Sequence, residues 1–113
     1  MANISWSGRI KSGIREGNIQ TTGAVVAAPS PTTRYYSLKS VFISADAIIE
    51  VTIEDDASTP NVLLSKIHVA AEGFVPMYFD PGEIPVATGQ GVFAKADGTA
   101  DVLVYVSVYE HGN

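Results

Sequence analysis

The segment Ala100–Glu110, ADVLVYVSVYE, constrains the fold more than any other part of the chain. Its residues alternate with a period of two: valines occupy one face, and a leucine and two tyrosines occupy most of the other. β-Branched and aromatic residues at this period are typical of a β-strand and do not build the stripe of an amphipathic helix. Because both faces are largely apolar, we expect this strand to lie in the middle of a sheet or to face a partner.

The same alternation recurs upstream, between turns rich in Gly, Pro, Asp and Asn. Pro76 lacks a backbone N–H donor, so its strand is expected at a sheet edge or at a bulge. The Asp97–Gly98 turn before the final strand is typical of a β-hairpin. Further strands are predicted at Gly23–Ala28, Arg34–Ala45, Ile48–Glu54, Val62–Ala70, Phe74–Asp80 and Gly91–Ala96. Strands this short, with turns about every 8–12 residues, predict an all-β fold: a single small β-sandwich or jelly-roll domain.

The N-terminal stretch has a different pattern. Gly and Ser interrupt it, and large apolar residues such as Trp6 stand singly. We therefore interpret residues 1–22 as an extended N-terminal arm and residues 23–113 as the β-sandwich domain. A terminus is ordered only when something holds it, and Trp6 has little use in a disordered tail. We expect the arm to dock on a protein surface.

Charge is unevenly distributed along the chain. Residues 1–39 carry a net charge of +4, whereas residues 40–113 carry −9. A basic arm that reaches an acidic neighbour, such as the body of an identical chain, would explain this asymmetry; chance and solvation are the alternative. The basic residues are dispersed and make a poor footprint for phosphates, so we expect no nucleic-acid partner.

The sequence contains no recognisable catalytic motif and no cysteine, which excludes disulfides and thiolate metal sites. We interpret His68 as a surface or interface histidine and His111 as part of a frayed terminus. The acidic run Glu54–Asp56 has the oxygen ligands that calcium prefers, but a solvated loop is the stronger interpretation. We therefore expect no catalytic residue, no metal, no cofactor and no enzymatic activity.

Binding to other proteins is the function class that remains. The charged fraction, 17%, is below the usual quarter, which indicates that part of the surface is not meant for water. Amphipathic aromatic residues and arginine are enriched at protein interfaces. The same aromatic residues can also line sugar-binding surfaces. Our interface candidates are Trp6, Arg9, Tyr35, Tyr36, Tyr105 and Tyr109.

The sequence shows neither a membrane-spanning segment nor a signal peptide. No apolar run approaches the roughly 20 residues of a membrane-spanning helix. The first residues, Met1–Arg15, lead into no apolar segment of the kind found in signal peptides. We expect a chain that has no membrane partner and is made in the cytoplasm.

The segment Ser37–Glu110 resembles small β-sandwich virion proteins of tailed bacteriophages. The residues that carry the resemblance are SLKSVFISA, IIEVTIEDD, NVLLSKIHVAAEG and, most of all, the closing segment FDPGEIPVATGQGVFAKADGTADVLVYVSVYE. Residues 1–36 lie outside it. The resemblance brings no catalytic residues with it.

The resemblance implies a head decoration (cement) protein, made in the host cytoplasm and carried on the capsid exterior. Such a protein would bind and stabilise the shell of major capsid protein and would self-associate, most often as a homotrimer. The alternative is a tail or tail-tip module that binds a carbohydrate or receptor through exposed tyrosines. A small hydrolase is a third and weaker reading, because paired acids in a deep pocket are not evident.

Overall fold

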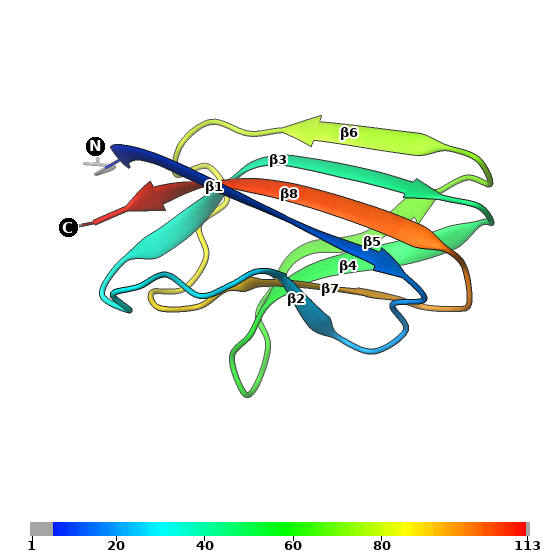
Figure 1. Ribbon diagram of the computed structural model, residues 1–113, viewed down its shortest axis with the longest axis horizontal. Helices are drawn as coiled ribbons and strands as arrows, with labels where there is room; N and C mark the ends of the chain where they lie inside the picture. The colour runs from blue at the N-terminus through cyan, green and yellow to red at the C-terminus, as the bar shows by residue number, and fades with distance from the viewer. Residues whose placement is uncertain (1–5, 113) are drawn as a thin grey trace.

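The computed structural model describes residues 6–112 and folds them into two four-stranded antiparallel sheets (Figure 1). The first sheet has the strand order β1-β8-β3-β6, and the second has the order β2-β7-β4-β5. The expected all-β fold is therefore confirmed, and none of residues 6–112 lies in a helix long and apolar enough to cross a membrane. The strands are β1 (Trp6–Gly17), β2 (Gly23–Val26), β3 (Tyr35–Ala45), β4 (Ile49–Asp55), β5 (Val62–Val69), β6 (Phe74–Tyr78), β7 (Val92–Ala96) and β8 (Val102–His111).

The core lies between the two sheets. Strand β8 runs between β1 and β3, as the apolar character of both its faces predicts. Its inward valines, Val102 to Val108, are at most 1% exposed, and they share the core with residues such as Val51 and Ile53 of β4. Fully burying one such side chain contributes about 1.5–3 kcal/mol. The alternation in the final segment thus supplies four fully buried side chains of the core.

Two turn-related predictions have different outcomes. Strand β6 is an edge strand, as Pro76 indicates. The predicted hairpin at Asp97–Gly98 is wrong, because β7 belongs to the second sheet and β8 to the first. The Asp97–Gly98 turn instead carries the chain from the second sheet to the first. In this turn the Asp97 carboxylate accepts a 3.0 Å hydrogen bond from the Glu50 N–H. The place beside β7 is taken by β2 and β4, so the final strand completes the other sheet.

The division at residue 22 does not match the structure, because residues 6–17 of the expected arm are strand β1. This strand pairs with β8 without interruption from Arg9 to Gly17. Ile19 follows it into the core at 1% exposure. Sequence pattern missed the strand because its inward positions hold Arg9, Lys11, Gly13 and Arg15 in place of apolar residues. Residues 1–5 lie outside the described part of the chain.

The connection from β6 to β7 folds back over one end of the first sheet. The N–H of Gly82 donates to Ser37 Oγ at 2.9 Å, and backbone bonds join Leu38 to Ile84 and Tyr36 to Val86. These bonds hold the connection against the first half of β3. Farther along the outer side of this sheet, large side chains such as Phe74 and Tyr78 are exposed.

Candidate protein-interaction face

The outward-pointing side chains of the first sheet form one continuous surface, which we call the outer face. Strand pairing aligns them in rows: Ile14, Tyr105, Phe42 and Pro76 lie side by side across all four strands. Successive side chains of a strand point to opposite faces, so the residues that alternate with the buried core belong to this surface. The outer face comprises Ile10, Ser12, Ile14 and Glu16 of β1; Leu103, Tyr105, Ser107 and Tyr109 of β8; Ser40, Phe42 and Ser44 of β3; and Phe74, Pro76 and Tyr78 of β6.

Large apolar side chains are unusually exposed on the outer face. Ile10 and Ile14 on one edge strand are 51% and 52% exposed, and Phe74 and Tyr78 on the opposite edge strand are 63% and 73% exposed. Between these edges Phe42 and Tyr105 are partly exposed, whereas Ser40 and Ser107 are buried. Single exposed apolar residues are common, but several large ones on one side of a sheet are typical of an interaction surface. Glu16 is the one acidic member of the face, so little charge has to be desolvated when a partner covers it.

The aromatic rings of the outer face are packed against one another. Phe42 lies at the centre, with ring centroids 5.8 Å from Phe74, 5.6 Å from Tyr78 and 6.0 Å from Tyr105. The Tyr109 hydroxyl donates to the carbonyl oxygen of Phe79 at 3.2 Å. Rings held in fixed positions lose little conformational freedom when a partner binds. The cluster is therefore preorganised for contact.

The pKa of the Tyr105 hydroxyl is affected by two neighbouring serines. Hydrogen bonding with the side chains of Ser12 and Ser107 lowers the pKa of Tyr105 below its ordinary value. The polar end of the Tyr105 ring thus lies near serines, while its apolar body stacks on Phe42. Amphipathic contacts of this kind are characteristic of protein interfaces.

The outward side of the second sheet has a different composition. Most cross-strand neighbours there are polar, such as Thr52 with Lys95 and Glu50 with His68. Phe93 and Val62, which is 56% exposed, lie on the same side next to Glu54. His68 is exposed, in agreement with its interpretation as a surface residue. The outward side of the second sheet is therefore mainly polar, whereas that of the first sheet presents more apolar surface.

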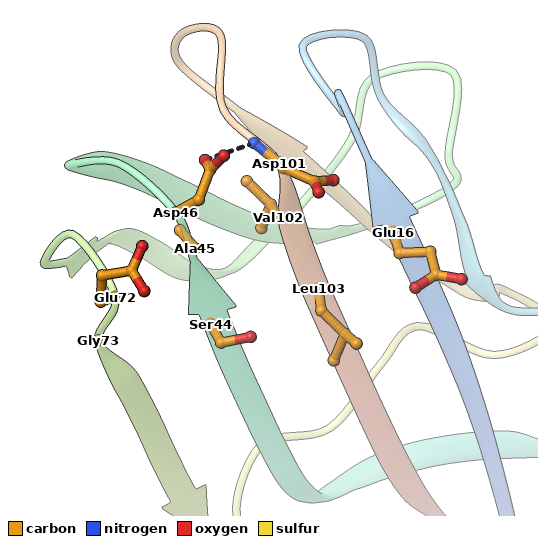
Figure 2. A pocket seen from close by; sticks show the side chains of 9 residues that line it. All are labelled: Glu16, Ser44, Ala45, Asp46, Glu72, Gly73, Asp101, Val102 and Leu103. Atoms are coloured by element: carbon orange, nitrogen blue, oxygen red, sulfur yellow. Dashed lines mark hydrogen bonds between the residues drawn. The ribbon is translucent and has the colours of Figure 1, made fainter.

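An acidic pocket of about 350 Å³ opens at one end of the first sheet (Figure 2). Four carboxylates line it, those of Glu16, Asp46, Glu72 and Asp101. Asp46 Oδ1 accepts a 2.8 Å hydrogen bond from the Asp101 N–H, so one of the four stabilises a loop. No histidine lines this pocket, and within residues 6–112 no three His, Asp or Glu side chains are placed to hold a metal ion.

The structure separates the six interface candidates. Tyr105 and Tyr109 lie on the outer face. Tyr36 cannot serve as a surface contact, because it is fully buried and its hydroxyl donates to the Ala27 carbonyl at 2.7 Å. The Trp6 side chain lies outside the described residues, although its backbone begins β1 opposite His111.

Arg9 and Tyr35 both contact residues at the C-terminal end of β8. Arg9 forms an ion pair with buried Glu110, and Tyr35 stacks on His111 with ring centroids 4.7 Å apart. His111 is completely buried, and its Nε2 lies 2.7 Å from Ser37 Oγ. The interpretation of His111 as a frayed terminus is wrong, because pairing with β1 and β3 holds it in the sheet.

The acidic run after β4 has internal partners. The carboxylate of Asp55 accepts hydrogen bonds from the N–H groups of Ala57 and Asn61 and from the Asn61 side chain, at 2.7–3.1 Å. Asp56 accepts from the N–H of Gly91, and Glu54 accepts from the Thr22 hydroxyl. These bonds close the loop and join neighbouring segments. The solvated-loop interpretation is therefore too simple, since Glu54 and Asp55 are buried.

Sequence reasoning missed two rings of the outer face, Phe42 and Phe74. A usable signal was present in the chain. In both β3 and β6, aromatic residues alternate with the residues expected in the core, so they fall on the opposite face. What the pattern lacked was the pairing that aligns these rings with Tyr105.

The chain matches no protein-family model, and no curated protein is detectably similar to it in sequence. Its fold is similar to that of a chain in a solved structure described as "Cyanophage Pam1 capsid asymmetric unit". The two chains superpose with a TM-score of 0.55 and 13% sequence identity. The match covers 96% of this chain and 89% of the other. Similarity at this level of identity defines a shared fold.

Proposed function

We propose that this chain is a structural protein of a phage virion, a decoration (cement) protein that binds the capsid exterior through its outer face. The observation that carries the proposal is the exposed aromatic surface of the first sheet, presented on a fold shared with a chain of a cyanophage capsid. The strand order, β1-β8-β3-β6 beside β2-β7-β4-β5, is that of a jelly roll, an architecture common in viral capsids.

The chemistry of the two sheets supports this orientation. The outer face combines packed rings with the exposed Ser12 and the partly exposed Ser44, which suits a partner surface of mixed apolar and polar character. The polar second sheet would then face solvent. In this proposal the major capsid protein is the partner and binding is the whole activity, so the chain is not an enzyme. As a phage protein it would be made in the host cytoplasm.

Self-association belongs to the same proposal. Several weak contacts held in one assembly bind far more tightly than a single contact, because each later contact forms at a high effective concentration. The resemblance implies a homotrimer, and the mass of the free protein in solution decides how many chains associate.

Binding to particles tests the proposal directly. Purified protein is mixed with capsids of the encoding phage that lack it, and the pelleted particles are assayed for bound chain. Saturable binding, together with greater resistance of the capsids to heat, is expected. Protein that remains in the supernatant would contradict a capsid role.

Locating the chain on the head or on the tail of the virion tests the second candidate, a tail or tail-tip module. Tyr78 favours it, because an aromatic ring 73% exposed can stack on a sugar. A glycan-binding measurement on the isolated protein, with labelling of intact virions, separates the two. Binding to glycans and labelling of the tail would support the second candidate and overturn the first.

A further inference from the structure

The four edge strands of this sandwich differ in how well they are protected from pairing with another chain. An edge strand presents unpaired N–H and C=O groups and pairs with a second chain unless something blocks it. In β6, Pro76 removes a donor. In β5, the pairing shifts register at two places and Lys66 has a φ of 49°. Strand β2 has four residues and a register shift.

Strand β1 has none of these interruptions from Arg9 onward. Its inward side carries Arg9, Lys11 and Arg15, and charges of this kind can protect an edge. These three are already engaged within the chain, because Arg9 and Lys11 lie against Glu110 and Arg15 donates to the Thr21 carbonyl. It is 12 residues long and keeps one regular register with β8 from Arg9 to Gly17. It forms a margin of the first sheet (Figure 1). Its outward side chains in this stretch include Ile10 and Ile14, each about half exposed, with Ser12 midway between them. An edge of this kind is suited to pairing with a second strand.

We propose that β1 pairs antiparallel with β1 of a second copy of this chain, with the two-fold axis at Ser12. Residues opposite each other in an antiparallel pair share a face of the sheet. In this register, Ile10 of each copy lies opposite Ile14 of the other, and the two Ser12 side chains face each other. The sequence of the strand is therefore complementary to itself, as a two-fold interface requires.

Neighbouring registers lack this complementarity. An axis at Gly13 would place Ile10 opposite Glu16, and an axis at Lys11 would place Ile10 opposite Ser12, so in neither register do the isoleucines meet. With the axis at Ser12, Arg9 faces Arg15 of the second copy on the inward side. Both guanidinium groups are held within their own chain, Arg9 by Glu110 at 2.8 Å and Arg15 by the Thr21 carbonyl at 2.7 Å.

The pairing would join two first sheets into one eight-stranded sheet, with both outer faces on the same side. The two isoleucines of each β1 would close the gap between the aromatic clusters. A two-fold pair does not close into a ring of three, so it replaces the trimer that the resemblance implies. The pairing stands whether or not the partner is a capsid.

Disulfide trapping tests both the contact and its register, because the natural chain has no cysteine. Opposite Cα atoms in antiparallel pairs lie about 4.5–5.5 Å apart, within the range that a disulfide spans. Ser12→Cys should therefore form a covalent dimer on mild oxidation at micromolar concentration. Ser65→Cys, at a serine that is also exposed and lies on edge strand β5, is the matched control and should stay monomeric on a denaturing gel.

The mass in solution provides the second readout. The natural protein should have the mass of two chains by light scattering, and Ile14→Lys should have the mass of one chain with an unchanged circular dichroism spectrum. Ile48→Lys, at a residue 69% exposed outside this edge, should remain a dimer. A natural protein of one or three chains, or equal crosslinking of the two cysteine variants, would overturn the pairing. If the natural protein forms the dimer but does not bind capsids, the result would count against the capsid role and leave the β1 pairing intact.

Discussion

Arg9 Nε lies 2.8 Å from Oε1 of Glu110, and this ion pair joins the first strand to the last. Glu110 is completely buried, and Lys11 Nζ and Arg34 Nη1 lie 3.4 and 3.8 Å from its carboxylate oxygens. A buried carboxylate loses its hydration, and the loss is tolerable only when cations surround it. Strand β1 supplies two of the three, so the charge cluster depends on β1 being in place.

Removing the charge of Glu110 should therefore destabilise the fold. Glu110→Gln leaves three partly exposed cations around a neutral group, and leaving such hydrogen-bonding partners poorly satisfied costs about 1–3 kcal/mol. Urea denaturation should show a loss of that order in the free energy of unfolding. Glu16→Gln, an exposed acid on β1, is the control and should change it by less than about 0.5 kcal/mol. Equal effects for the two variants would mean that the cluster contributes nothing specific.

The strands of the body could be predicted from sequence because apolar residues alternate within them, most clearly in Val102–Val108. Strand β1 could not, because its inward side uses arginines, a lysine and a glycine, which find partners only in the folded chain. Its isoleucines point outward, so the apolar alternation in this segment describes a surface. Tyr36 and Tyr105 could not be told apart either, since only strand pairing shows which tyrosine faces the core.

Gly13 should tolerate no side chain. A Cβ at this position would overlap the carbonyl oxygen of Val25, where β1 crosses close to β2. Gly13→Ala must separate two backbone segments, and overpacking of this kind costs about 1–3 kcal/mol or more. Gly98→Ala is the control, since its Cβ would lie 3.4 Å from the flexible end of Ile49. Thermal unfolding should show a clear decrease in Tm for the first variant and a small change for the second; the reverse order would refute the packing at Gly13.

Asp55 should make stability depend on acid pH. Burial raises the pKa of its carboxyl group, but hydrogen bonds from Asn61 and Ala57 outweigh burial and lower the pKa below its ordinary value. A lowered pKa in the folded state stabilises the protein above the unfolded value of about 3.9, and this contribution is lost as pH falls through the folded value.

Asp55→Asn should accordingly cost about 1–3 kcal/mol near pH 7. The difference in unfolding free energy between this variant and the natural protein should shrink as pH is lowered below about 4. Denaturant unfolding at a series of pH values measures it. A difference that stays constant down to the lowest pH would show that the carboxylate's charge is not what stabilises the loop.

The outer face should be dispensable for folding and required for attachment. Phe74→Ser combined with Tyr78→Ser removes two of its most exposed side chains, so the free energy of unfolding should change little. Loss of an aromatic anchor often costs a complex about 2 kcal/mol or more, which corresponds to more than a tenfold loss of affinity. Co-sedimentation with capsids should show that loss. Ile48→Ser, at another exposed apolar residue, should bind as the natural protein does.

The position of the chain on the virion tests the capsid role most directly. A cryo-electron microscopy reconstruction of the phage that encodes it should show the sandwich on the outside of the head. The sheet β1-β8-β3-β6 should lie against the major capsid protein, with Phe42, Phe74 and Tyr78 in the contact and the second sheet toward solvent. Density for the chain on the tail alone, or a sandwich attached through β2-β7-β4-β5, would contradict the proposed role.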